Sequence, residues 1–462
     1  MSDRTAGLTA AAQHAQAFLD TLDERPVAAR VDAAEVREAL GGPVPEQGED
    51  PKAVVNALVA GADPGLVASA GPRYFGFITG GALPAALAAD WLVSAWDQCV
   101  DFHSHSPAAA AIEEVTSAWT LDLLGLPATA SVGFVTGGQG ANTTCLAAAR
   151  HAVLARAGWD VENDGLIGAP PVRILCGEEA HVTVYTALRL LGLGADTSIR
   201  VAADDQGRMK PDALRDALAK ADGPTIVCAQ AGNAASGAFD AFEPIADACA
   251  THNAWLHIDG AFGLWAAAAP STRHLTRGVE RADSWAVDAH KWLNVPHDAG
   301  MAIVADPEIH VAAMRLAAPH LMVDDGQRDS TNYVPECSRR ARALPVYAAI
   351  RSLGRAGIAE LIERNCVQAR RMAERLSAIP GATVLNDVVL SQVLLRLPGG
   401  DDANRIAMAA VQREGTCWVG GTTWQGRYVL RVPICNWATT NDDVDRAADA
   451  ISRMAQAIPS RT

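Results

Sequence analysis

Lys291 has the surroundings that most favour covalent chemistry in this sequence. It stands in Asp288-Ala289-His290-Lys291-Trp292 and follows Asp259, the acid that ends the apolar run 254–259. An ammonium group in a mostly apolar stretch is costly unless it is paired or loses its proton. A neutral lysine is a nucleophile that forms a Schiff base with an aldehyde. The plainer alternative is an exposed or ion-paired lysine without a chemical role.

Pyridoxal phosphate (PLP) is the aldehyde cofactor that such a lysine most often holds, and it also requires a carboxylate beside its pyridine nitrogen. Asp259 is the candidate, because a protonated ring accepts the electron pair left when a bond to the substrate Cα breaks. An acid at the end of a strand could instead cap the following turn. The sequence therefore predicts a PLP site in which Lys291 and Asp259 lie close together.

The turn Thr-Gly-Gly-Gln-Gly-Ala-Asn-Thr at 136–143 is the candidate phosphate site. Gly138, Gln139 and Gly140 lie between a predicted strand and a predicted helix. Glycine lets backbone N–H groups approach an anion, and a helix N-terminus adds positive potential. The motif matches neither a P-loop nor a dinucleotide fingerprint, and many sheets use such glycines for the tight turn alone. Its position upstream of Asp259 and Lys291 favours the phosphate interpretation.

Two further polar residues are candidates for the same site. His181 begins a predicted helix, where its ring could lie flat on a pyridine and touch the substrate carboxylate, or could be structural. Arg431 lies within the apolar strand 428–433, where a guanidinium requires an anionic partner. A substrate carboxylate and a structural ion pair would serve Arg431 equally well.

Strand and helix patterns alternate between residues 82 and 310. Continuous apolar strands that alternate with amphipathic helices indicate an α/β fold, with a mostly parallel sheet covered by helices on both faces. Ligands bind beyond the carboxyl ends of the strands in such sheets, and the candidate residues lie there. We expect strands at 131–136, 172–176, 199–203, 225–230, 255–259, 284–288 and 300–304, and helices at 141–155, 181–191, 211–219 and 241–250.

The chain is expected to have three parts: an N-terminal helical segment, a large α/β domain and a small C-terminal α+β domain. Their predicted bounds are 1–85, 86–330 and 331–462. The first part contains predicted helices at 9–21, 33–40 and 52–60. The last contains predicted helices at 344–376, 403–414 and 442–457, and strands at 382–385, 392–397 and 428–432.

Composition and charge limit the possible partners and location. The net charge of −15 disfavours nucleic acid and anionic membrane surfaces, which attract basic proteins. No run of about 18 apolar residues predicts a membrane span, and residues 1–9 do not resemble a signal peptide. The nine cysteines form no CxxC pair, and an odd number is typical of reduced thiols. We expect a cytoplasmic protein.

Together these motifs resemble the group II PLP-dependent decarboxylases, the fold type I family that contains aromatic-amino-acid and glutamate decarboxylases. The resemblance runs from about residue 72 to the final helix, and it implies the fold type I architecture with a seven-stranded, mostly parallel sheet. The most specific motifs are HIDGAFG (257–263) and DAHKWLN (288–294). Supporting motifs are GFVTGGQGANTT (133–144), EEAHVTV (178–184), SRRARALPVYAAIRSLG (338–354) and VLRVPICN (429–436).

The resemblance implies a role for each matching residue. Lys291 would form the Schiff base, Asp259 would pair with the pyridine nitrogen, and His181 would stack on the ring. The remaining cofactor contacts would come from Gly138, Gln139, Gly140 and His290 at the phosphate and from Asn233 at the cofactor's edge.

On the substrate side, the resemblance implies contacts from an aromatic loop and one arginine. Family members are homodimers whose active sites lie at the subunit interface, with an N-terminal segment packed across it. The aromatic stretch 71–81 could equally serve packing alone. The implied substrate residues are Tyr74, Phe75, Thr79 and Arg431.

Two departures from the family pattern affect the chemistry. The phosphate turn has glycine where relatives often carry serine, so backbone donors must bind more of the phosphate. Many relatives use a tyrosine on a mobile loop to protonate the Cα. The corresponding region, 322–336, contains Tyr333, which lies closer to the stretch 338–340 than the family spacing predicts. Without such an acid, relatives can divert the reaction toward oxidative deamination.

The leading hypothesis is the PLP-dependent decarboxylation of an L-amino acid to the amine and CO2. An alternative keeps the cofactor and changes the outcome to oxidative deamination, transamination or a lyase reaction. A non-catalytic α/β protein that binds PLP for structure or regulation is the alternative from another class. Aromatic residues such as Trp91, Trp96 and Trp292 could favour an apolar substrate side chain or could be core, so the sequence leaves the amino acid open.

Overall fold

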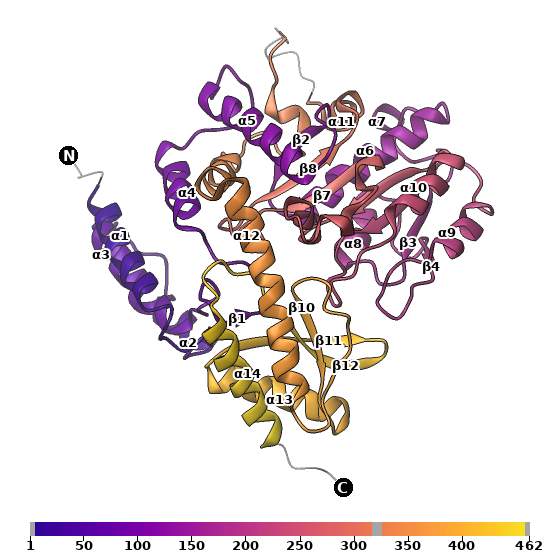
Figure 1. Cartoon of the computed structure of the whole chain (residues 1–462). Helices are drawn as coiled ribbons and strands as arrows, with labels where there is room; N and C mark the ends of the chain where they lie inside the picture. Colours follow the sequence, from indigo (N-terminus) through magenta and orange to yellow (C-terminus); the bar gives the residue numbers. More distant parts are fainter. Residues whose placement is uncertain (1–4, 317–325, 458–462) are drawn as a thin grey trace. The chain divides into compact units, whose positions relative to one another are not determined.

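The computed structural model describes residues 5–316 and 326–457, and Figure 1 colours their elements along the chain. Its largest feature is a seven-stranded sheet with the order β2-β8-β7-β6-β5-β3-β4. The pairs from β7 to β4 are parallel, and β8 is antiparallel to both of its neighbours. The prediction of a mostly parallel seven-stranded sheet is therefore confirmed. The strands are β2 (Ser131–Val135), β3 (Arg173–Gly177), β4 (Ile199–Val201), β5 (Thr225–Gln230), β6 (Trp255–Asp259), β7 (Ser284–Asp288) and β8 (Gly300–Val304).

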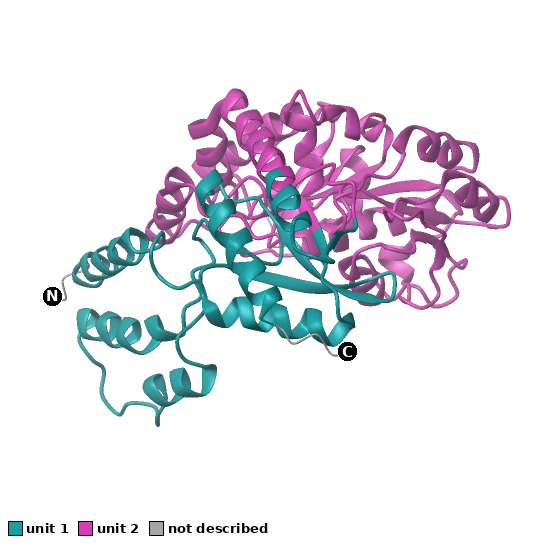
Figure 2. Cartoon of the chain, turned by 60° about the horizontal axis from the view of Figure 1, so that its bottom comes forward, with its two compact units in different colours: residues 1–77, 371–385, 394–462 teal, residues 78–370, 386–393 magenta. Residues whose placement is uncertain are grey.

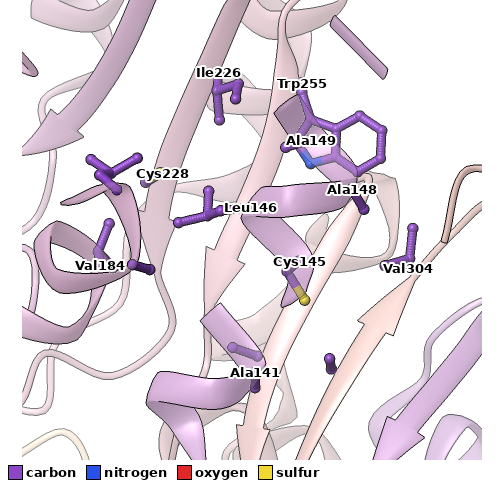
Figure 3. Packing of buried hydrophobic residues seen from close by; sticks show 14 of the residues in the cluster. Ala141, Cys145, Leu146, Ala148, Ala149, Val184, Ile226, Cys228, Trp255 and Val304 are labelled. Carbon is purple, nitrogen blue, oxygen red and sulfur yellow. The ribbon is translucent and has the colours of Figure 1, made fainter. Parts of the chain in front are cut away.

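Both faces of this sheet are buried. Successive side chains of a strand point to opposite faces, so Trp255 and Leu256 of β6 lie on different sides, and each is 1% exposed. The face that carries Trp255 packs on α6 (Gly138–Arg156), whose small side chains let the helix approach closely. Figure 3 shows Ala148 and Ala149 of that helix beside Trp255. Helices α7 (Val161–Asp164), α8 (Val182–Leu190), α9 (Pro211–Leu218), α10 (Phe242–Thr251) and α11 (Pro307–Met314) complete the alternation.

Most of these elements begin and end within a few residues of their predicted bounds. One of the differences affects the site. Helix α6 begins at Gly138, three residues before the predicted start, because its first turn consists of the glycine-rich motif itself. Gly138, Gln139 and Gly140 therefore belong to the helix and not to the turn before it. Helices α4 (Pro84–Trp96) and α5 (Pro107–Leu124) were not predicted, although each begins with a proline at a favoured first-turn position.

The chain divides into two compact units, coloured separately in Figure 2. One comprises Ile78–Arg370 and Asn386–Val393 and contains the seven-stranded sheet. The other comprises Met1–Phe77, Arg371–Leu385 and Leu394–Thr462. It joins N-terminal and C-terminal segments because β1 (Tyr74–Phe75) pairs in parallel with β11 (Trp418–Trp424). The three-part division at residues 85 and 330 stays a prediction.

A second sheet has the order β1-β11-β12-β10-β9. Its other strands are β9 (Thr383–Val384), β10 (Gln392–Arg396) and β12 (Arg427–Pro433). The remaining helices are α1 (Ala6–Asp20), α2 (Ala33–Leu40), α3 (Pro51–Ala62), α12 (Ala343–Ser377), α13 (Gly400–Glu414) and α14 (Asn441–Gln456). Short 3-10 helices are η1 (Asp63–Gly65), η2 (Gly263–Ala268), η3 (Arg273–Thr276), η4 (Val279–Arg281) and η5 (Ser330–Tyr333).

A buried ion-pair network fastens the segment after residue 326 to the sheet. Glu113 of α5 accepts two hydrogen bonds from Arg339, at 2.6 and 3.0 Å, and lies 3.4 Å from Nη1 of Arg328. Arg328 also donates to the backbone oxygen of Val132 on β2 at 2.6 Å. Although burial by itself raises the pKa of Glu113, the guanidinium groups of Arg339 and Arg328 outweigh it and hold the pKa below its usual range.

Replacing Glu113 with alanine is expected to lower the free energy of unfolding by about 3–5 kcal/mol, because the buried Arg339 charge would lose its partner. Urea unfolding near pH 7 measures the change. The lowered pKa makes this stabilisation complete above pH about 4–5 and lost as the pH falls through the folded-state pKa. As a control, Glu360→Ala breaks the exposed pair with Arg364 and should cost less than about 1 kcal/mol. Equal losses for both variants would contradict a special role for the buried pair.

Candidate active site

Lys291 follows the carboxyl end of β7 and is ion-paired. Its Nζ lies 2.9 Å from Oδ2 of Asp288, the last residue of that strand. The Asp288 side chain is 2% exposed and that of Lys291 is 20% exposed. The lysine is thus only partly exposed and has a neighbouring carboxylate that the sequence analysis did not include. The spacing of three residues is the local signal that could have identified Asp288.

The glycine-rich start of α6 lies directly against Asp288 and His290. A Cβ atom on Gly137 would lie 2.8 Å from Cε1 of His290, and one on Gly138 would lie 2.8 Å from Oδ2 of Asp288. Neither position can take a side chain without displacing its neighbour. Gly137 provides no side-chain cap, so the first N–H groups of α6 are oriented for an anion. The structure therefore brings Gly138, His290 and Lys291 together around Asp288, and their contacts with a cofactor stay a prediction.

His290 is held between a carboxylate and a second imidazole. Its Nε2 lies 3.6 Å from Oδ1 of Asp288, and its Nδ1 accepts a hydrogen bond from the backbone N–H of Ala299 at 3.3 Å. Its ring stacks on that of His297 with a centroid distance of 4.4 Å. Burial lowers the pKa of both histidines, against the opposing effect of the Asp288 charge. His297 was not among the predicted site residues.

Asp259 ends β6 and is almost fully buried. Its Oδ1 accepts a hydrogen bond from the backbone N–H of Ala261 at 3.1 Å, and its Oδ2 accepts one from Nδ2 of Asn142 at 3.2 Å. These two hydrogen bonds hold the carboxylate in a fixed position at the end of β6. Asn142 lies within the predicted phosphate motif but was given no role in the sequence analysis.

His181 and Asn233 occupy neighbouring loops. His181 caps α8, and its Nδ1 lies 2.8 Å from Oγ1 of Thr183. Asn233 donates through Nδ2 to the backbone oxygen of Glu179 at 3.2 Å, and its Oδ1 accepts from the N–H of Ala235 at 2.8 Å. Asn233 therefore links its own loop to the loop that carries His181.

The predicted substrate residues fall into different parts of the chain. Thr79 is next to Gly80, where a Cβ atom would lie 2.0 Å from the backbone oxygen of Lys291. Tyr74, Phe75 and Arg431 belong to the other compact unit. There the Tyr74 ring stacks on Trp418 at 5.1 Å, Phe75 is buried, and burial lowers the pKa of Arg431. Contact of these residues with substrate stays a prediction.

Tyr333 lies against the edge strand β2. Its ring is 5.3 Å from that of His310 in an edge-on arrangement, and the Arg328 guanidinium lies over it at 4.1 Å. Its backbone oxygen occupies the space that a Cβ atom on Gly133 would need. These contacts do not connect Tyr333 to the group around Lys291, and its role as an acid stays a prediction. Residues 322–325 of the predicted loop lie outside the described residues.

His257 is a fully buried histidine two residues before Asp259. Its Nδ1 lies 2.9 Å from Oγ of Ser284, and its Nε2 lies 2.8 Å from Oδ1 of Asn142. Burial lowers the pKa of His257 to about 4, although the Asp259 charge acts in the opposite direction. The side chain is therefore neutral at physiological pH.

The depressed pKa predicts a pH dependence of stability. Between pH 6.5 and about 4 the unfolded chain takes up a proton at His257 that the folded chain does not, so the free energy of unfolding falls as the pH falls. From pH 7 to 5 this loss should be about 2 kcal/mol smaller in His257→Gln than in the wild type. Urea unfolding at both pH values measures it. His252→Gln, at an exposed histidine, should retain the wild-type slope, and an unchanged slope in His257→Gln would contradict the assignment.

Comparisons with known proteins agree with this site. The family model of the pyridoxal-dependent decarboxylase conserved domain matches residues 35–398. The L-2,4-diaminobutyrate decarboxylase of Rhizobium meliloti (strain 1021) is 32% identical over 387 residues, which cover 80% of this chain and 75% of that protein. The 4-hydroxyphenylacetaldehyde synthase of Rhodiola rosea is 27% identical over 465 residues, covering 96% of this chain and 93% of that protein.

A solved structure shares the fold over nearly the full length. The crystal structure of Oryza sativa TDC with PLP and tryptamine superposes with a TM-score of 0.90 at 25% identity. The alignment covers 98% of this chain and 97% of that one.

Among residues 5–316 and 326–457, no helix is both long and apolar enough to cross a membrane.

Proposed function

We propose that Lys291 is the covalent residue of this chain, which belongs to the pyridoxal-dependent decarboxylase family. The reaction is the PLP-dependent decarboxylation of an amino acid, in which the substrate and one proton become the amine and CO2. One observation carries the role of Lys291: its Nζ, the Asp288 carboxylate and the open first turn of α6 meet at one edge of the sheet. Lysine next to a phosphate cradle is the donor set that PLP requires.

The residues around Lys291 fit three polar groups of the cofactor: its aldehyde, its pyridine nitrogen and its phosphate. Lys291 is proposed to hold the aldehyde, and the Asp259 carboxylate to hold the protonated pyridine nitrogen. His181 is proposed to cover the ring, with Asn233 supporting the loop before it. The phosphate would lie on the N–H groups of Gly138, Gln139 and Gly140, with His290 beside them. When bound, PLP supplies the electron sink that lets CO2 leave.

The negative charge of Asp288 must be balanced if a phosphate binds next to it. A carboxylate next to a phosphate is unfavourable unless a cation balances it, and Lys291 is the neighbouring cation of Asp288. Because glycines in the phosphate turn provide no side-chain donor, phosphate binding depends on backbone N–H groups and on the dipole of α6. Asp288 is proposed to keep the Lys291 amine in place, directed toward the first turn of α6.

Substrate contacts are proposed for Tyr74, Phe75, Thr79 and Arg431. Arg431 would bind the substrate carboxylate through its fork of donors. Because Tyr74 and Phe75 are buried, the exposed side chain of this aromatic stretch is Phe77, which is 67% exposed and lies 5.4 Å from the Trp418 ring. We propose Phe77 as an additional contact to substrate or to a second subunit.

A homodimer is proposed as the working assembly. The N-terminal helices expose large apolar side chains that a second copy could cover, among them Leu8 at 60%, Val54 at 48% and Leu58 at 55% exposure. Sedimentation velocity should give twice the mass of the chain, and Leu58→Asp should shift the distribution toward monomer.

A cytoplasmic location is proposed because all nine cysteines are free thiols. Cell fractionation with a thiol label checks that location.

Two observations favour a second outcome. A relative of 27% identity is named an aldehyde synthase, and Tyr333 has contacts that hold it against β2. Protonation of the substrate Cα would then depend on another acid, and oxidative deamination to an aldehyde becomes the competing reaction.

One assay over a panel of L-amino acids distinguishes the outcomes. Purified protein loaded with PLP is incubated with each amino acid, and CO2, amine, aldehyde and peroxide are measured. Amine and CO2 in equal amounts are the expected result. Aldehyde, peroxide and ammonia in place of amine would mean that loss of CO2 is coupled to oxidative deamination with O2 as the oxidant, which leaves the role of Lys291 intact. No product from any amino acid would refute the proposed activity.

A further inference from the structure

A continuous line of hydrogen bonds runs from the interior of the sheet to Asp259. Nε1 of Trp255 lies 3.0 Å from Oγ of Ser284, which lies 2.9 Å from Nδ1 of His257. Nε2 of His257 lies 2.8 Å from Oδ1 of Asn142, and Nδ2 of Asn142 lies 3.2 Å from Oδ2 of Asp259. The first four residues are at most 1% exposed. Water therefore does not compete for these bonds.

The chemistry of the two ends gives every bond in this line one direction. An indole N–H can only donate, and an ionised carboxylate can only accept. Trp255 therefore donates to Ser284, whose single hydroxyl proton goes to Nδ1 of His257. The remaining proton of the neutral imidazole is on Nε2 and is donated to Asn142. The amide of Asn142 must then turn its Nδ2 toward Asp259.

Asn142 also begins a branch that reaches His181. The second proton of its Nδ2 is directed to Oγ1 of Thr183 at 3.1 Å. That hydroxyl is 2.8 Å from Nδ1 of His181, and its own proton is the one available for this bond. Nδ1 of His181 therefore accepts, and the neutral ring carries its proton on Nε2. One asparagine amide is hydrogen-bonded toward both residues proposed to hold the pyridine ring.

The fold explains why these groups meet. Trp255, His257 and Asp259 alternate along β6 and so face the same side of the sheet, toward α6. Ser284 is the register partner of His257 on the neighbouring strand β7. Trp255 belongs to the same buried cluster as the small residues of α6, visible in Figure 3. Asn142 lies on that helix, one turn beyond its glycine-rich start.

We propose that Asn142 is a positioning residue that fixes the Asp259 carboxylate and the His181 ring together, with the Trp255–Ser284–His257 line fixing Asn142. The proposal rests on the roles given to Asp259 and His181 under the proposed function. Asn142 itself touches neither the reacting atoms nor the substrate. It fixes the position of the Asp259 carboxylate, which is proposed to bind the pyridine nitrogen, relative to the His181 ring, which is proposed to cover the ring face. Cofactor binding then does not have to order these two side chains.

Three variants test the proposal. Asn142→Leu keeps the size of the side chain and removes every donor and acceptor at the branch point. Thr183→Val removes the branch from Asn142 to His181, both the bond from Nδ2 of Asn142 to the hydroxyl and the bond from the hydroxyl to His181, and leaves the bond from Asn142 to Asp259. Thr144→Val is the matched control, because Thr144 is a buried residue of α6 whose hydroxyl has no hydrogen-bond partner in the described structure.

The first readout is PLP binding by cofactor-free protein, followed by absorbance, together with the pH dependence of the bound cofactor's spectrum. Asn142→Leu should raise the PLP dissociation constant about tenfold or more and move the spectral transition by about one pH unit. Thr183→Val should lower kcat about tenfold with the dissociation constant within about threefold. Thr144→Val should match the wild type. Wild-type binding and an unmoved transition in Asn142→Leu would overturn the proposal.

The second readout does not depend on the cofactor. In cofactor-free protein with ¹⁵N-labelled histidine, His257 should be neutral at pH 7.5 with its proton on Nε2, and the neutral form of His181 should likewise carry its proton on Nε2. Proton positions on Nδ1 would overturn the proposal even if Asn142→Leu failed to fold. Failure of the proposed function is a separate result, because wild-type protein that forms no amine can still show the predicted histidine tautomers.

Discussion

Replacing Lys291 with alanine is expected to abolish amine formation, lowering kcat by at least about 10⁴-fold. The residue is proposed to hold the cofactor aldehyde covalently, and alanine has no nucleophile to offer. The partly buried Nζ is 2.9 Å from Asp288, so no other lysine can replace it without rearranging the end of β7. Amine release measured over a range of protein concentrations gives the residual rate.

Borohydride reduction provides a direct check of the same residue. Reduced wild-type protein should carry the cofactor on the peptide that contains Lys291, and Lys291→Ala should carry none. Lys210→Ala, at the exposed residue before α9, is the matched control and should behave as wild type in both tests. Full activity of Lys291→Ala, or a label on a different peptide, would refute the assignment of the covalent residue.

Replacing Asp259 with asparagine is expected to lower kcat by about 10²–10³-fold. Asparagine retains the shape of the side chain and can still accept from Asn142 and Ala261, but it has no negative charge. A pyridine nitrogen beside it would lose the charge that stabilises its proton, and with it the capacity to take up electron density. Steady-state kinetics on the preferred amino acid measure the loss.

Asp283→Asn is the control for Asp259→Asn. Asp283 is also a largely buried carboxylate that accepts a backbone N–H, from Leu256 at 2.7 Å, but it precedes β7 at the opposite end of that strand from Lys291. Its replacement should change stability and leave kcat within about threefold of the wild type. Asp259→Glu should recover part of the activity, because it restores the charge at an altered distance. Equal activity of Asp259→Asn and the wild type would remove Asp259 from the cofactor site.

Both regions should lose stabilisation in acid, but for different physical reasons and over different pH ranges. Glu113 has a lowered pKa because of two guanidinium groups, so its contribution is lost in acid as the carboxylate is protonated. His257 has a lowered pKa because it is buried, so its contribution is lost as the unfolded chain gains a proton below pH 6.5. Comparing the two variants therefore separates an ion-pair effect from a desolvation effect within one protein.

The amino-acid sequence by itself determined the strands of the seven-stranded sheet, their order along the chain and the residues at their carboxyl ends. The runs 225–230, 255–259, 284–288 and 300–304 were predicted with the bounds that the structure has. Continuous apolar runs of this length are a local signal, because a strand buried on both faces must be apolar throughout. Lys291, Asp259 and Gly138 were found for the same reason, since Asp259 ends β6, Lys291 lies three residues after β7 and Gly138 begins α6.

Only the tertiary structure decided which side chains meet across elements. Asn142 on α6, His257 on β6 and Ser284 on β7 are far apart in the sequence, and their hydrogen bonds depend on sheet order and on the register between strands. The pairing of β1 with β11 likewise joins the two ends of the chain in one unit. Local periodicity shows which residues are buried. It does not show which buried polar groups face each other, because that depends on contacts between distant segments.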